Sequence, residues 1–211
     1  RAVKSRFGEA VAEDISGFTY EAERKADLEE MRAWKIFPDV RGAKIEDHMT
    51  GERDGRRLSL SRVSIVYDRR RGKSYFDPSL YCFRVDFGTA SEFSGTTVVV
   101  GKEESLRFGR AAEKTHGLVP AATGSAEFDE KYRVYATDKG TAERDLILSV
   151  RSAFPALEKV CAAVGPILIF MPKRMTVLFP LESFDFAFEP KPFWIPLDHD
   201  RALAAFASDL A

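Results

Sequence analysis

The chain has 211 residues, of which 45% are hydrophobic and 31% are charged. These fractions are typical of a folded globular protein and exclude a disordered or fibrous one. Its 32 basic and 33 acidic residues give a net charge of -1, so only a local patch could attract nucleic acid or an anionic membrane.

The two cysteines, Cys82 and Cys161, form no CxxC pair, and we expect buried thiols in a reducing compartment. No apolar run approaches the roughly 20 residues that span a bilayer, and we find no signal peptide. Because the chain begins with Arg1 instead of Met, we expect it to be a fragment or a processed product.

Two helices are predicted at the start of the chain. Val3, Phe7, Val11 and Ile15 recur every four residues, which indicates a helix over about residues 2–16. A second helix is predicted over about residues 22–35, with its apolar side formed by Leu28, Met31 and Trp34. Together they form an N-terminal helical pair over about residues 2–36.

The pattern then changes to the period of two that is typical of strands. Asp54-Gly55 separates two such runs, which predicts a hairpin. Leu58 and Leu60 have the opposite parity to Val63, Ile65 and Tyr67, so a bulge near Ser61–Arg62 is expected to bring both groups to one face.

Further strands are predicted over residues 80–88 and 93–101, joined as a second hairpin by a turn at Ala90–Glu92. Residues 102–125 show no period and are predicted to be a long connection. A strand at 127–136 follows, with one exposed face, and Asp138 is expected to cap a helix reaching Val150.

In the rest of the chain we predict a helix near residues 155–164, a third hairpin around Pro172–Arg174, a strand at 184–190 and a helix after Asp198. The fold class is therefore predicted to be α+β: an antiparallel sheet built from hairpins and packed by N-terminal, central and C-terminal helices. We expect one domain over residues 1–211, with the sheet and helix body at about 43–211.

Signatures of catalysis are absent from the sequence. The stretch GTTVVVGKE at residues 95–103 has the wrong spacing for a phosphate-binding loop and places Glu103 at the hydroxyl position. His48, His116 and His199 have no partner at metal-ligand spacing. We therefore predict no metal, no cofactor and no assigned catalytic residue, and we favour a non-enzymatic protein.

Two groups of residues are candidates for binding. The first is a basic segment flanked by aromatic residues, and the second is an aromatic pair after a Pro-Lys-Pro break. Such residues bind single-stranded nucleic acid, anionic headgroups or partner proteins, although we favour a solvated loop for the first group and core packing for the second. The candidates are Arg69, Arg70, Arg71, Lys73, Tyr75, Phe193 and Trp194.

An alternative site could assemble from the 102–125 segment and the exposed face of strand 127–136. Its candidates are Asp129, Arg133, Tyr135 and Asp138. This enzyme hypothesis requires a deep pocket that holds a carboxylate with a strongly shifted pKa. Each of these residues also has a structural explanation, in cross-strand pairs or a helix cap.

The stretch EFDEKYRVYATD at residues 127–138, followed by AERDLILS at 142–149, resembles the signature segment of a bacterial family known as domain of unknown function 3137. Residues 37–63 and 83–100 are similar to two further segments of that family in the same order. Arg144 lies one position later than the family's basic residue. The resemblance implies a domain that often follows one or two N-terminal membrane helices, and it brings no catalytic residue, substrate or cofactor.

From the residues and the resemblance together we expect a binding or interaction domain on the cytoplasmic side of a bacterial membrane. It would be tethered by sequence absent from this chain, with a membrane surface or a protein as its partner. The enzyme is the alternative, and weak binding of nucleic acid or anionic lipid through residues 69–73 ranks third, with nucleic acid the less favoured of these ligands.

Overall fold

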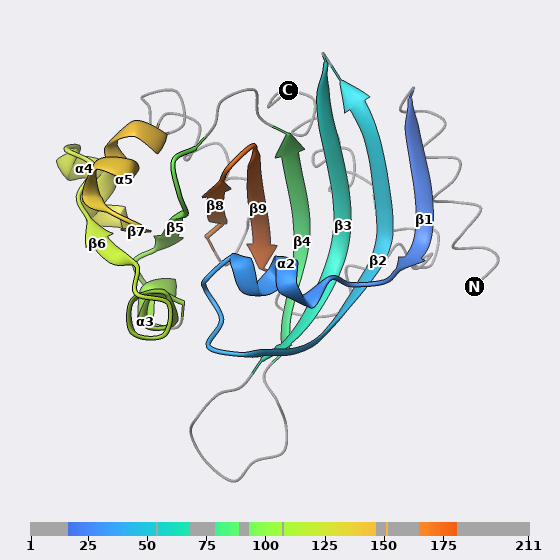
Figure 1. The fold of residues 1–211 in the computed structure, drawn as a ribbon, viewed down its shortest axis with the longest axis horizontal. Coiled ribbons are helices and arrows are strands. Elements are labelled where there is room, and N and C mark those ends of the chain that lie inside the picture. The colour runs from blue at the N-terminus through green and yellow to red at the C-terminus, as the bar shows by residue number, and fades with distance from the viewer. Residues whose placement is uncertain are drawn as a thin grey trace, which may run out of the picture.

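The computed structural model describes residues 17–53, 55–67, 79–88, 93–106, 108–146, 151 and 165–180. These residues form an open antiparallel sheet of nine strands in the order β1-β2-β3-β4-β9-β8-β5-β7-β6 (Figure 1). The helices that accompany it are short, so the described part of the chain is mostly β. The predicted antiparallel sheet is confirmed, whereas the helices are minor.

The strands are β1 Phe18–Arg24, β2 Val40–Arg53, β3 Arg56–Tyr67, β4 Ser79–Gly88, β5 Thr97–Gly101, β6 Val119–Ala121, β7 Tyr132–Ala136, β8 Ile167–Met171 and β9 Arg174–Pro180. The helices are α2 Leu28–Ala33, the 3-10 turn η1 Glu104–Leu106, α3 Gly109–Lys114, α4 Ala126–Lys131 and α5 Lys139–Asp145. The helices predicted at 2–16, 155–164 and after 198, and the strand at 184–190, lie outside the described residues.

The predicted helix over residues 22–35 is wrong in its first half. Residues 18–24 form β1, because Phe18, Tyr20 and Ala22 alternate with exposed polar residues at the strand period. The helix begins only at Leu28, where the Asp27 carboxylate accepts hydrogen bonds from the amides of Glu29 and Glu30. The second helix of the predicted N-terminal pair is therefore replaced by a strand and one helix of six residues, whereas the first lies outside the described residues.

Two of the three predicted hairpins are confirmed. Arg53 pairs with Arg56 across a two-residue turn in which Gly55 has a φ of 72°. Met171 pairs with Arg174 across Pro172-Lys173. The hairpin predicted between β4 and β5 is wrong, because β4 pairs with β3 and β9, while β5 pairs with β7 and β8. An apolar strand such as β5 is buried on both faces and needs a central place.

A bulge is present at the predicted position, but it lies in the neighbouring strand. Glu46 pairs with Arg62 and Met49 pairs with Leu60, so the two residues Asp47 and His48 of β2 face one residue of β3. Asp47 has a φ of 51°, a conformation that aspartate tolerates better than most residues. The bulge therefore places two buried polar side chains in β2, the neighbour of strand β1 at the end of the sheet.

We expected the bulge to bring the apolar residues of β3 to one common face, and this prediction is also wrong. The register of β3 with β4 is unbroken from Leu58 to Val66, so residues of opposite parity point to opposite faces. Leu60 is buried in one core and Val63 in the other. The sheet thus buries apolar side chains on both faces, and the buried face of β3 changes along its length.

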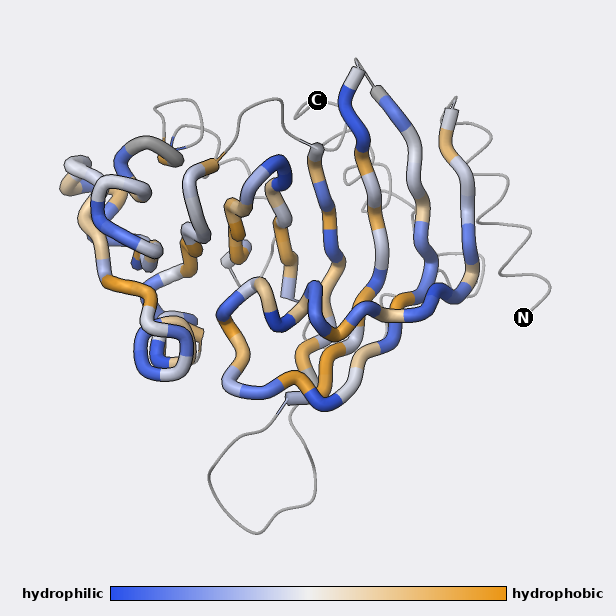
Figure 2. The backbone as a smooth tube through the Cα atoms, in the orientation of Figure 1, coloured by the Kyte–Doolittle hydropathy of each residue, from blue (hydrophilic) through white to orange (hydrophobic). Residues whose placement is uncertain are grey.

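We call these cores the α2-side core and the α4-side core. The α2-side core packs Met31, Trp34, Phe37 and Phe108 against the sheet, and α2 crosses the front of the sheet in Figure 1. The α4-side core packs Phe128, Ala142 and Leu146 against the other face. Apolar residues are concentrated along β8, β9 and β5, whereas the β2–β3 tip is hydrophilic (Figure 2).

Residues 102–125 are not the aperiodic connection that we predicted. They contain η1, α3 and β6, each too short to display a period. The predicted strand at 127–136 is also shorter than expected, because residues 126–131 form α4 and the strand begins at Tyr132. The Ser125 hydroxyl caps α4 by accepting from the amide of Phe128, and acidic residues in the first turn favour the helix.

We expect Gly109→Ala to lower the free energy of unfolding by about 1–3 kcal/mol through overpacking. A Cβ at residue 109 would lie 2.2 Å from the Tyr135 hydroxyl oxygen and 2.5 Å from its Cζ. Gly101→Ala is the matched control, because its Cβ meets no atom within 4 Å, and its effect should stay within about 0.5 kcal/mol. Urea unfolding of both variants measures the difference, and equal midpoints would contradict the close approach.

Candidate functional site

Both groups of predicted binding residues, the basic segment and the aromatic pair, lie outside the described residues. They comprise Arg69, Arg70, Arg71, Lys73, Tyr75, Phe193 and Trp194. Their role as a binding surface therefore stays a prediction.

Two of the alternative candidates stabilise local structure. The Asp129 carboxylate accepts hydrogen bonds from the amide and the hydroxyl of Thr123, at 3.0–3.1 Å. Asp138 caps α5, because its carboxylate accepts from the Thr141 amide at 2.8 Å and from the Thr141 hydroxyl at 2.6 Å. The predicted cap at Asp138 is confirmed.

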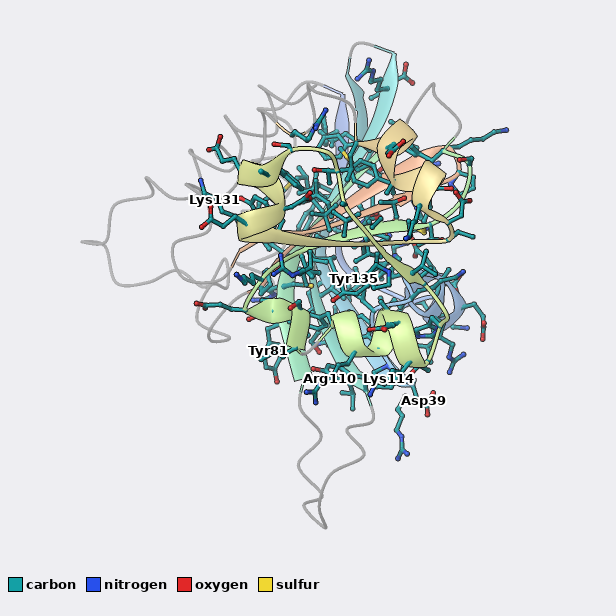
Figure 3. The ribbon with its side chains drawn as sticks, turned by 90° about the vertical axis from the view of Figure 1, so that its left-hand side faces the viewer. Asp39, Tyr81, Arg110, Lys114, Lys131 and Tyr135 are labelled. Atoms are coloured by element: carbon teal, nitrogen blue, oxygen red, sulfur yellow. The ribbon has the colours of Figure 1, made fainter. Side chains whose placement is uncertain are left out.

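The other two candidates also have structural contacts. Arg133 donates to the carbonyl oxygens of Asp129 and Tyr132, at 2.5 and 3.0 Å. Tyr135 was expected on an exposed face, but it is buried in the α2-side core close to α3. In Figure 3 it lies inside the molecule, whereas Arg110, Lys114 and Lys131 lie at the periphery. Burial is the main cause that raises the pKa of Tyr135, and the charge of Glu113 adds to it.

The main ionic group of the described residues was not evident from the sequence, and we call it the Arg84 cluster. It comprises Glu30, Trp34, Arg84, Asp86 and Arg174. Arg84 Nη2 donates to Glu30, and its Nε lies 2.7 Å from Asp86 Oδ2. Arg174 also contacts Glu30. The Arg84 guanidinium lies 5.0 Å from the centre of the Trp34 ring, a cation–π distance.

The Arg84 cluster contains two cations and two carboxylates, and Arg84 and Asp86 are its most deeply buried charged members. The side chains of Arg84 and Asp86 are 6% and 11% exposed. Asp86 also accepts hydrogen bonds from Ser59 at 3.1 Å and from Thr176 at 2.6 Å. Burial acts to lower the pKa of Arg84, but the charges and hydrogen bonds of Asp86 and Glu30 outweigh it, so that the pKa is raised. The Arg84 guanidinium is therefore held in its charged form by its two carboxylate partners.

The ion pairs of the Arg84 cluster join separate secondary-structure elements, so the cluster fixes the position of α2 on the sheet. Glu30 on α2 is joined to Arg84 on β4 and to Arg174 on β9. A signal in the sequence could have revealed it: Arg84 and Asp86 continue the strand face on which Leu80 and Cys82 are buried. Charged residues on an apolar face need partners, because burying an unpaired charge is costly.

A second polar group surrounds the bulge, and we call it the bulge cluster. It comprises Tyr20, Arg24, Asp47, His48 and Arg62. The Tyr20 hydroxyl donates to Asp47 Oδ1 at 2.8 Å, and Arg62 Nη2 lies 3.3 Å from Asp47 Oδ2. Arg24 Nη1 lies 2.6 Å from His48 Nε2. The cluster therefore links β1, β2 and β3 at one point.

His48 is 5% exposed. Its burial is the main cause that lowers its pKa below the ordinary value, and the positive charges of Arg24 and Arg84 act in the same direction. Glu21 and Asp86 oppose the shift with their negative charges. His48 is therefore held neutral at neutral pH.

Three further observations concern the described residues alone. No group of three or more histidine, cysteine or carboxylate side chains among them is placed to hold a metal ion. Of the helices in this part of the chain, none combines the length and the apolar character that crossing a bilayer requires. Cys82 is a buried free thiol, and burial raises its pKa to about 12.

The fold defines a class, an open antiparallel sheet with short helices on both faces, and one solved structure shares it. The crystal structure of the mycobacterial trehalose monomycolate transport factor A, TtfA, matches with a TM-score of 0.51 and 14% sequence identity. The match covers 98% of this chain and 95% of that one. At this identity the likeness concerns the fold alone. No protein-family model and no curated protein matches the sequence.

We expect Arg84→Met to lower the free energy of unfolding by about 3–5 kcal/mol, because it leaves the buried Asp86 carboxylate without its cation. Arg174→Met is the matched control. It removes the other cation from Glu30, but its side chain is 34% exposed, so the loss should be about 1 kcal/mol or less. Urea midpoints measure both changes, and equal losses would show that the burial of Arg84 does not set its contribution.

Proposed function

We propose that this chain is a non-enzymatic binding or interaction domain of a membrane-associated bacterial protein. The observation that carries the proposal is the coverage of the structural match, which extends over 98% of this chain and 95% of TtfA. Because the match extends over nearly all of both chains, the likeness applies to the whole domain and not to a short shared motif. Because TtfA is a transport factor for trehalose monomycolate, we propose a role in handling a lipid at a membrane.

The use of the charged residues supports a binding role over catalysis. In the described residues Arg84, Asp86 and Glu30 join α2 to the sheet, while Asp129 and Asp138 complete local backbone structure. The alternative enzyme site needs Asp129 and Tyr135 to work together. Instead, Asp129 is bonded to Thr123, and Tyr135 packs in the α2-side core.

We also propose membership of the domain of unknown function 3137 family, on the sequence segments quoted above. This assignment carries the expectation of a tether upstream of residue 1 and a cytoplasmic location for the domain. The tether would keep the domain close to the bilayer, where even weak contacts with headgroups are effective because of the high local concentration.

The tether is tested by flotation of the gene's complete product and of residues 1–211, each with phosphatidylglycerol–phosphatidylcholine vesicles. We expect the complete product to float with vesicles of any charge and residues 1–211 to float weakly, and only with anionic vesicles. Equal flotation of the two proteins, or flotation of neither, would remove the tether from the proposal.

Residues 69–73 are the proposed headgroup contact within the chain. Each basic residue near an anionic surface contributes about 1 kcal/mol. Replacing Arg69, Arg70 and Arg71 with Gln should therefore reduce binding of residues 1–211 to anionic vesicles by up to about 100-fold. Sedimentation with vesicles of increasing phosphatidylglycerol content measures the change.

The matched control replaces Arg110, Lys114 and Lys131 with Gln. These three cations are exposed on α3 and α4 (Figure 3), so the control removes the same charge from another surface. We expect it to retain most of the binding. A loss as large as that of the 69–71 variant would mean that net charge, and not this segment, determines the attraction.

A further inference from the structure

Strand β1 lies at one end of the sheet, and within the described part of the chain it pairs only with β2. Two side chains of β1 reach the bulge. Tyr20 donates to Asp47, and Arg24 contacts His48. Because Asp47 and His48 are the two residues of the bulge, the irregularity in β2 is also the point at which β1 is held by side chains.

The contact between Arg24 and His48 requires a neutral imidazole. A guanidinium has N–H donors and no acceptor, so at 2.6 Å His48 Nε2 must be the acceptor. The imidazole proton is then on Nδ1, which is buried and has no hydrogen-bond partner among the described residues. A second proton, on Nε2, would point a donor at a donor and place two cations in contact.

The surroundings of His48 contain few groups that could stabilise the added charge. Arg24 and Glu21 face it from β1, and Arg84 and Asp86 face it from β4. Arg62 on β3 is paired with Asp47 and Glu46, and Asp86 is already paired with Arg84. His48 is only 5% exposed and is therefore surrounded by two cations and two carboxylates. Of the carboxylates, Asp86 is already paired with Arg84, and Glu21 is exposed to solvent.

We propose that His48 is a proton-sensitive clamp for β1: its protonation releases Arg24 and loosens the edge strand while the rest of the sheet stays folded. This device goes beyond the proposed function and does not depend on it. It concerns β1, so a change at His48 alters how firmly this strand is attached to β2.

The direction of the effect follows from the linkage between protonation and opening. Burial lowers the pKa of His48 in the closed state, whereas the released side chain has the ordinary value of 6.5. Above that value both states are neutral and the clamp is intact. As the pH falls below it, the open state gains protons first, and the opening equilibrium rises by up to about tenfold per pH unit. Below the lowered pKa no further change is expected.

Hydrogen–deuterium exchange read by mass spectrometry tests the clamp on the complete chain. Exchange of peptides covering β1 and β8–β9 is compared at about pH 7.5 and about pH 5, after correction for the intrinsic exchange rate. In the wild type, β1 should lose protection at the lower pH and β8–β9 should not. In His48→Gln, a neutral acceptor that does not titrate, the protection of β1 should be independent of pH.

His116→Gln is the matched control. His116 lies in the turn after α3, with Nε2 2.6 Å from the Phe37 carbonyl oxygen, and its replacement should leave the pH dependence of β1 intact. The proposal is wrong if β1 keeps its protection at the lower pH, if His48→Gln retains the loss, or if β8–β9 opens together with β1.

A measurement on the wild-type chain keeps the test decisive if a variant does not fold. An NMR titration should show the His48 imidazole and the β1 amides shifting with one midpoint below 6.5. Different midpoints, or β1 amides that do not titrate, would overturn the clamp.

Discussion

The burial of apolar side chains on both faces of one sheet is the constraint on which the rest of the structure depends. In β8, Ile167 and Ile169 belong to the α2-side core, whereas the intervening Leu168 belongs to the α4-side core. A strand of this kind must be covered on both sides. Short elements provide the cover: α2 and α3 on one face, α4 and α5 on the other. For covering the sheet, the length of these helices matters less than their position against it.

The Arg84 cluster holds one of these covers in place. Because β3 and β4 change their buried face along their length, polar and charged residues share a face with apolar ones. Arg84 and Asp86 occupy that position, and Glu30 on α2 completes the ion pair. Buried ion pairs contribute little net stability, but they penalise arrangements in which a partner is missing. The cluster therefore specifies where a helix of only six residues sits on the sheet.

Local signals in the sequence were sufficient for part of this fold. Asp54-Gly55 and the alternating runs around it identified the β2–β3 hairpin, and Asp138 identified the start of α5. Prediction failed where a choice depends on partners distant in sequence. Nothing in residues 79–101 indicates that β4 pairs with β9 instead of β5. The parity change in β3 was visible, but one core was assumed, and only the three-dimensional structure shows that there are two.

The polar clusters were harder to foresee for the same reason. Glu30 and Arg84 are separated by 54 positions, Glu30 and Arg174 by 144, and Arg24 and His48 by 24. Each pair forms only after the strand order is fixed, so no spacing rule could find it. The two clusters nevertheless differ in one physical respect. The Arg84 cluster pairs cations with carboxylates, whereas the contact of Arg24 with His48 pairs a cation with a neutral imidazole. Imidazole is the side chain whose ordinary pKa lies between pH 5 and 8, and this contact lies at β1, in which no residue is fully buried.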